Sequence, residues 1–129
     1  MTESNERSSE SATEQELGRE LLRIHEESYG ASAASPRVYI HDDAVFCILD
    51  GLELMPNEEF LIGAGHQDAV IAIRTQYQRA IEATFSAAVE RATGRRVISF
   101  SSTTGLSPNY VVEIFRLGPP EAAPEIPEE

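Results

Sequence analysis

The stretch PNEEFLIGAGHQDAVIAIRTQYQRAIEATFSAAVERATG, residues 56–94, decides the fold of this chain. Pro56 suits the first turn of a helix, and Gly63-Ala64-Gly65 interrupts the helical pattern, so we expect a short helix at 56–62. From about His66 the apolar residues recur every three or four positions, which predicts one long helix ending at Thr93-Gly94. The apolar stripe of this helix consists of Val70, Ile73, Tyr77, Ile81, Phe85, Ala88 or Val89, and Ala92.

One charged residue interrupts this apolar stripe. Arg74 lies between Ile73 and Tyr77, near the edge of the face that is expected to be buried. Its aliphatic stem can cover the core while the guanidinium reaches water, and this is the interpretation that we favour. Pairing with a carboxylate across a dimer is the alternative.

Two strand-like pairs flank the long helix. Residues 37–41 and 44–50 predict a hairpin with Asp42-Asp43 at its turn, and its second strand is apolar on both faces. Residues 95–102 and 110–117 predict a second hairpin, joined by residues 103–109. A helix from Thr13 to about Tyr29 precedes them, opened by the capping-box pattern Thr13–Glu16 and closed by Gly30.

The order of these elements predicts the fold class. It is α-β-β-α-β-β, which favours an α+β two-layer sandwich with an antiparallel four-stranded sheet packed on one long helix. One helix leaves apolar sheet surface uncovered, above all at the doubly apolar strand 44–50, so we expect a homodimer, with the partner copy or the first helix covering the second face of that strand.

Composition divides the chain into one domain and two acidic ends. The chain has 129 residues, 41% of them hydrophobic, and a formal net charge of -12. Residues 1–27 carry -5 and residues 118–129 carry -4, whereas residues 28–117 carry only -3. We expect a disordered acidic arm at 1–12, a single domain at 13–117 and a disordered Pro/Glu tail at 118–129. The acidity argues against nucleic-acid binding and against a polybasic membrane anchor.

The remaining composition indicates a cytoplasmic protein. Cys47 is the only cysteine and cannot form an internal disulfide, so a reducing compartment is expected. The N-terminus lacks a basic stretch leading into an apolar one, and no apolar run approaches the length of a bilayer span. We therefore expect a chain that reaches a membrane only through a partner. All ten basic residues are Arg, which excludes a Schiff-base or P-loop lysine.

No pattern in the sequence forms a catalytic constellation. Cys47, in the middle of an apolar strand, is interpreted as a small core residue. Glu58 and Glu59 are interpreted as acids that complement the dipole at a helix start. His41 and His66 each lie beside an acid but do not supply three converging metal ligands. We therefore predict no catalytic residue, metal site, cofactor or enzyme activity, with a hydrolase that uses His41 or His66 as the least favoured alternative.

A partner or anion site is the remaining candidate. Arg95 and Arg96 follow a helix C-terminus, and Arg37 opens a strand, so these arginines are candidates for contact with an acidic partner. The small-residue loop 30–35 is a candidate anion nest formed around Gly30 and Ser32.

The chain resembles a known family through several short segments, which follow one another in the family's order: Gly30 after the first helix, Arg37–Ile40, Asp50-Gly51, Leu54–Glu58, Thr93–Val97 and Glu113–Leu117. Together they make residues 13–117 similar to a small bacterial family, the MpsC-like domain, which is grouped with the YbcI-type proteins. Two positions depart from the family pattern. Gly30-Ala31-Ser32 lacks the charge and the second glycine of the family's loop, and Met55 stands where the family often has Thr.

The resemblance implies a component of a Na+-translocating, membrane-potential-generating system that is associated with bicarbonate or CO2 supply. It implies no catalytic residues. We expect a non-enzymatic accessory or regulatory protein whose partner is a membrane transporter subunit. The alternative is a small-molecule-binding sensor with its ligand between the sheet and the loop 30–35.

Overall fold

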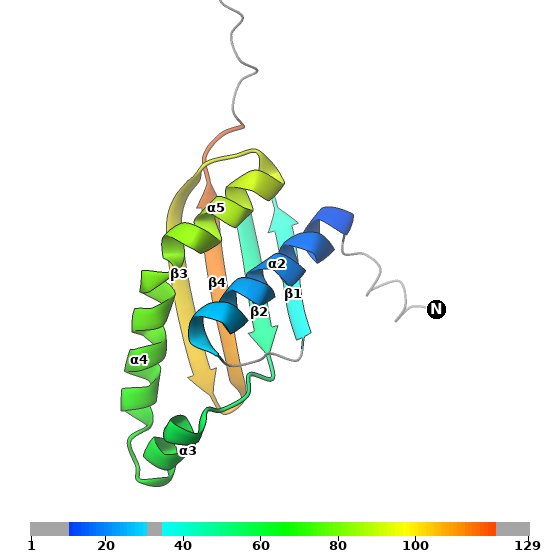
Figure 1. The fold of residues 1–129 in the computed structure, drawn as a ribbon. Coiled ribbons are helices and arrows are strands. Elements are labelled where there is room, and N and C mark those ends of the chain that lie inside the picture. The colour runs from blue at the N-terminus through cyan, green and yellow to red at the C-terminus, as the bar shows by residue number, and fades with distance from the viewer. Residues whose placement is uncertain (1–10, 31–34, 121–129) are drawn as a thin grey trace, which may run out of the picture.

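A computed structural model describes residues 11–30 and 35–120. Ser32 and most of the predicted acidic arm and tail therefore lie outside the described residues. Within them the chain forms four helices and four strands (Figure 1): α2 (Ala12–Tyr29), β1 (Ser35–His41), β2 (Ala44–Asp50), α3 (Pro56–Gly63), α4 (Gln67–Ala80), α5 (Glu82–Thr93), β3 (Val97–Leu106) and β4 (Asn109–Leu117).

The strands form one antiparallel sheet in the order β1-β2-β4-β3. Helices α2 and α5 lie across one face of this sheet, α4 runs beside β3, and α3 lies beyond one end of the strands (Figure 1). The predicted α+β class and the antiparallel four-stranded sheet are confirmed. The turn at Asp42-Asp43 is also confirmed, and Asp42 adopts a positive φ of 51° there.

The long helical pattern is divided at Ile81. This residue has φ -103° and ψ 8°, outside helical geometry, and it both ends α4 and precedes α5. The two helices consequently run in different directions (Figure 1). Because the sheet is twisted, one straight helix of this length could not follow β3 and also cross the other strands. The expectation of a single long helix is therefore corrected to two helices.

α2 begins earlier than the capping-box pattern predicts. Ser11, not Thr13, is the N-cap: its Oγ accepts a hydrogen bond from the Glu14 amide at 3.0 Å, and Glu14 Oε1 accepts one from the Ser11 amide at 2.6 Å. Glu14 Oε2 accepts a third hydrogen bond from the Ile40 amide of β1 at 2.7 Å. This tertiary contact favours the earlier start, so residues 11 and 12 belong to the folded domain.

β3 is longer than predicted, and the connection to β4 shortens from residues 103–109 to Ser107-Pro108. Thr103 and Thr104 pair with β4, as their β-branched side chains favour. Gly105 pairs with Tyr110, and a Cβ at position 105 would lie 2.3 Å from Cε1 of the Tyr110 ring. The strand therefore passes under this ring through a residue that has no side chain.

The hydrophobic core lies between the sheet and the helices. The alternate residues Val111, Phe115 and Leu117 of β4 are buried in it, and Cys47 of β2 is fully buried in the same layer. This confirms the interpretation of Cys47 as a core residue. The helices contribute Leu17, Leu21, Ile24, Phe85, Ala88 and Val89.

One carboxyl group lies within this apolar layer. Glu113 of β4 is 0% exposed and pairs in register with Cys47 and Ser102. Neither of its carboxyl oxygens accepts a hydrogen bond from the described residues. Burial raises the pKa of Glu113 to about 8, because a charged carboxylate is poorly solvated there. At neutral pH the side chain is therefore mostly protonated.

Glu113→Gln is expected to change how stability depends on pH. Between the ordinary pKa of 4.5 and the folded pKa of about 8, the folded state binds one proton more than the unfolded chain. The stability that this proton contributes is fully present below the ordinary pKa of Glu113. As the pH rises from the ordinary to the folded pKa, the free energy of unfolding falls by up to about 1.4 kcal/mol per pH unit. The variant should therefore gain stability over the wild type across this interval.

Urea unfolding at stepped pH measures this difference. The matched control is Glu82→Gln, because Glu82 is exposed at the start of α5 and should leave the pH dependence of the wild type unchanged. A Glu113→Gln variant whose stability runs parallel to that of the wild type would contradict the prediction.

Candidate functional site

A buried ion pair joins helix α3 to helix α4. Arg74 donates from Nε to Glu58 Oε2 at 3.0 Å and from Nη2 to Glu58 Oε1 at 3.1 Å, which is a bidentate arrangement. The side chains of Arg74 and Glu58 are only 3% and 5% exposed. The pair therefore fixes α3 against α4 in a place that water does not reach.

Further hydrogen bonds join this pair to the rest of the fold. Glu58 also accepts from the Tyr29 hydroxyl at the end of α2 and from the Met55 amide, the latter at 2.9 Å. Arg74 Nη1 donates to Asn109 Oδ1 on β4 at 2.7 Å, and the Asn109 amide group donates to the Leu52 carbonyl. We call Tyr29, Glu58, Arg74 and Asn109 the Glu58–Arg74 network. It links α2, α3, α4 and β4.

The electrostatics of the network favour the charged pair. Burial alone would raise the pKa of Glu58, but hydrogen bonds from Arg74, Tyr29 and the Met55 amide outweigh it and lower the pKa. Burial would likewise lower the pKa of Arg74, and the Glu58 carboxylate raises it instead. Burial and the hydrogen bond to Glu58 together raise the pKa of Tyr29 to about 12, so its hydroxyl remains a donor.

The sequence-based interpretation of these residues needs correction. Arg74 does not extend its guanidinium to water, nor does it wait for a carboxylate across a dimer, because Glu58 of the same chain already holds it. Glu58 lies at the start of α3 and caps the Met55 amide there, but it is buried rather than solvated. No motif spacing joins the two residues, since they come from different helices separated by a turn.

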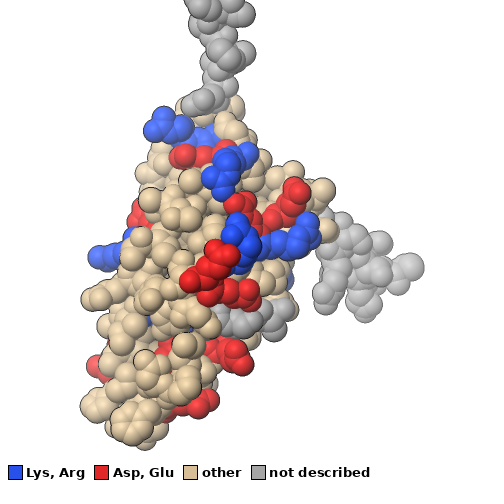
Figure 2. Space-filling model, in the orientation of Figure 1, with Lys and Arg blue, Asp and Glu red and all other residues tan. Residues whose placement is uncertain are grey.

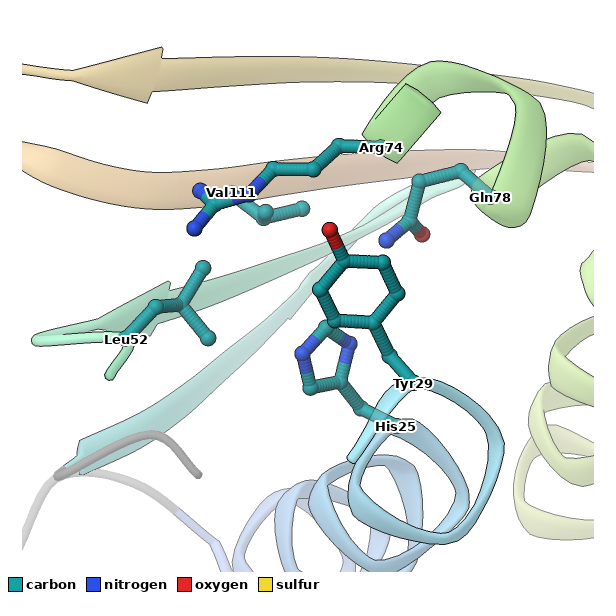
Figure 3. Close-up of a pocket in the computed structure, with 6 residues that line it drawn as sticks. All are labelled: His25, Tyr29, Leu52, Arg74, Gln78 and Val111. Atoms are coloured by element: carbon teal, nitrogen blue, oxygen red, sulfur yellow. The ribbon is translucent and has the colours of Figure 1, made fainter. Parts of the chain in front are cut away.

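A narrow cavity adjoins the network (Figure 3). It is lined by His25, Tyr29, Leu52, Arg74, Gln78 and Val111, and the space among them is too small for a water molecule. His25 is 2% exposed, and the described residues make no hydrogen bond to either of its ring nitrogens or to Gln78 Oε1. Burial, followed by the charge of Arg74, lowers the pKa of His25, so its imidazole is neutral. The cavity thus holds neutral polar atoms without partners.

The arginines proposed from the sequence lie in different parts of the fold. Arg95 donates to the Asp42 carbonyl at 3.0 Å and to Asp43 Oδ1 at 2.9 Å, so it clamps the β1–β2 turn. Arg96 is exposed beside Glu90, at 3.9 Å. Arg37 pairs with Asp50 at 2.6 Å, near the other end of the β1–β2 hairpin.

Gly30 also lies apart from Arg95 and Arg96. It caps α2 with φ 91°, and a Cβ there would lie 3.5 Å from Met55 Cε, close to the Glu58–Arg74 network. The residues proposed for a partner or anion site thus do not form one cluster, and their role stays a prediction. His41 is an exposed residue 3.4 Å from Asp42, and His66 precedes α4. Across residues 11–30 and 35–120, no three His, Cys, Asp or Glu side chains gather as metal ligands would.

The buried face of α4 is partly polar, so some apolar side chains of this helix remain exposed. Val70 is buried as predicted, but Arg74 and Gln78 share its face, so Ile73 and Tyr77 remain 45% and 39% exposed. Phe60 of α3 is 74% exposed. We call Phe60, Ile73 and Tyr77 the α3–α4 patch, in which the Tyr77 ring also packs edge-to-face on Tyr29 of α2, with ring centroids 4.6 Å apart. The surface over these helices carries few charged side chains on the side seen in Figure 2, whereas charges gather over α2 and α5.

Together these features define a small α+β protein in which a buried ion pair fixes the helices over one face of an antiparallel sheet. The chain belongs to the family described as Na+-translocating membrane potential-generating system (MpsC), whose profile matches residues 9–118. This confirms the resemblance found in the sequence. Searches of curated proteins and of solved structures found no match. None of the helices in the described part of the chain is both long and apolar enough to cross a bilayer.

Removing one member of the buried pair is expected to destabilise the fold strongly. Arg74→Met leaves the Glu58 carboxylate buried without its cation, which should cost about 3–5 kcal/mol. Glu58→Met combined with Arg74→Met should cost much less than the sum of the single changes, because no unpaired charge remains. Urea unfolding of the four proteins of this cycle measures the coupling.

Arg79→Met is the matched control, because Arg79 is exposed on the same helix and its loss should change stability by no more than about 0.5 kcal/mol. Additive effects of the Glu58 and Arg74 substitutions would show that the pair does not act as a unit.

Proposed function

We propose that this chain is a non-enzymatic accessory protein of a Na+-translocating, membrane-potential-generating system, and that its α3–α4 patch binds a protein subunit of that system. Family membership supplies the system. The observation that carries the binding role is the exposure of large apolar side chains, above all Phe60 at 74%, on helices that a buried ion pair holds in place. The chain then works in the cytoplasm and is held at the membrane by its partner.

The composition of the patch fits contact with a protein. Large apolar side chains that remain exposed near one another on a polar surface are typical of interaction sites, and Phe60, Ile73 and Tyr77 are exposed on two helices that the ion pair holds together. Burying one side chain of the size of Phe60 contributes about 1.5–3 kcal/mol, and tyrosines such as Tyr77 are frequent among the residues that dominate binding energy. Because α3 and α4 are already fixed to one another, little conformational entropy is lost when a partner binds.

The polar chemistry of the network supports a structural role. Both oxygens of Glu58 accept hydrogen bonds from within the chain, and each guanidinium nitrogen of Arg74 donates within it. A general base or nucleophile needs a free lone pair directed at a substrate. The network instead uses these groups to position helices.

Phe60→Asp is expected to weaken binding to the membrane subunits of the system at least tenfold, because a carboxylate cannot be desolvated at an apolar contact. The measurement is biolayer interferometry of the purified chain on those subunits in lipid nanodiscs. Ile98→Asp is the matched control, since Ile98 is 66% exposed but lies on β3, and it should bind as the wild type does.

Arg96→Glu is a third variant in this experiment, and it tests the arginine site predicted from the sequence. Equal binding by wild type and Phe60→Asp would rule out the patch as the contact. A wild-type chain that does not bind the subunits at all would rule out the accessory role.

A sensor function is the second candidate, and the cavity beside the network is the observation that favours it. His25 and Gln78 offer unpartnered polar atoms there, and Gly30 lies near the adjacent end of α2. A small ligand with its own hydrogen-bond donors and acceptors would satisfy these atoms, after His25 or Tyr29 changes its side-chain position to admit it.

The test of this candidate is a thermal-shift screen against a metabolite library. A compound present at about a hundred times its Kd should stabilise the native state by about 2.7 kcal/mol. His25→Phe should abolish the shift, whereas His41→Phe, a change at an exposed histidine, should retain it. A shift that is equal in both variants would exclude the cavity as the binding site.

A further inference from the structure

The second face of the sheet is not covered by any described helix. Figure 1 places all four helices on one face or at the margins of the sheet. Since side chains alternate along a strand, the residues between the buried positions of β2 and β4 point to the opposite, helix-free face. This face is a property of the sheet alone and is separate from the α3–α4 patch.

The centre of the helix-free face is apolar. The strand register aligns Phe46 with Ile114 and Ile48 with Val112, so these four side chains form a compact block on the central strands. Each of them is only partly buried, and Tyr39 beside Phe46 on β1 is 41% exposed. The block is flanked on β3 by the exposed residues Ser99, Ser101 and Thr103.

The charged side chains of this face lie at the two ends of the strands. Arg116 aligns with Ala44, and Ala44 aligns with His41, so Arg116 and His41 lie at one end of the face, where His41 is 3.4 Å from Asp42. Asp50, which aligns with Tyr110, lies at the other end, with Arg37 nearby as its partner within the chain. The face therefore carries Arg116 at one end, an apolar centre, and the Arg37–Asp50 ion pair at the other end, in a chain whose net charge is -12.

We infer that the helix-free face binds a second copy of this chain, sheet against sheet with the strands antiparallel, so that Arg116 of each copy meets Asp50 of the partner subunit. Identical faces associate through a two-fold axis that lies in the interface. An axis perpendicular to the strands places the Arg116 end of one copy over the Asp50 end of the other. An axis parallel to the strands would instead place the two Arg116 ends together, and their repulsion disfavours it.

The size of the face agrees with a dimer of modest affinity. Four strands about 4.8 Å apart, each contributing about seven residues, cover on the order of 450 Å2 per copy in projection. The accessible area of such a face exceeds its projection, so two copies approach the lower limit of about 1,200 Å2 for specific interfaces. We therefore expect dissociation at concentrations on the order of micromolar. This inference does not depend on the proposed function.

A charge-reversal mixture tests the inference, because both residues lie at exposed or partly exposed positions. Asp50→Lys also breaks the ion pair with Arg37, so circular dichroism checks the fold of each variant. In Arg116→Glu and in Asp50→Lys, both contacts between the copies become repulsive, so each variant alone should dimerise about tenfold more weakly than the wild type. In an equimolar mixture the two variants restore both contacts within the heterodimer. Sedimentation velocity over a wide range of concentrations measures the wild type, the two variants and their mixture.

The expected result is a concentration-dependent wild-type dimer, weaker association of each variant and recovery in the mixture. Phe60→Asp, which changes the other apolar surface, should dimerise as the wild type does. A monomeric wild type, a mixture that associates no better than its components, or loss of the dimer in Phe60→Asp would each overturn the inference.

Discussion

The buried pair between Glu58 and Arg74 is the interaction on which the arrangement of the helices depends. A guanidinium that is taken out of water needs a carboxylate in bidentate geometry, and Glu58 supplies it at 3.0 and 3.1 Å. Satisfying this requirement turns the polar side of α4 toward the sheet. It also fixes α3, which has little apolar contact of its own with the core, and it ties both helices to the ends of α2 and β4 through Tyr29 and Asn109.

The outer surface of the protein follows from that orientation. Because Arg74 and Gln78 are turned inward, Ile73 and Tyr77 remain partly exposed on α4, as Phe60 does on α3. The sheet has a comparable asymmetry, since the helices bury only one of its faces and the block of Phe46, Ile48, Val112 and Ile114 lies on the other. The protein thus presents two apolar surfaces on different layers, and we propose a protein partner for one of them and a second copy of the chain for the other.

Much of the fold could be predicted from the sequence, because local rules govern it. Apolar patterning and turn residues identified all four strands, and glycines at positions 30 and 94 marked helix ends that the structure keeps in the left-handed conformation. The predicted ends of helices and strands were wrong where a residue distant in the sequence determines them. Glu14 reaches an amide of β1 and moves the start of α2, and the ring of Tyr110 covers Gly105, so that β3 continues past the expected turn.

The candidate site could not be predicted in the same way. Apolar periodicity ranks residues by hydrophobicity, so it assigned Ile73 and Tyr77 to the core and left Arg74 at the edge, whereas the structure buries Arg74 beside its carboxylate. The sequence by itself determined the four strands, the order of helices and strands, and the family, since these depend on neighbouring residues and on short motifs, whereas the division of the long helix at Ile81 came from the structure. Only the tertiary structure decided which face of α4 is buried and which charges meet, because those depend on groups that folding brings together from separate helices.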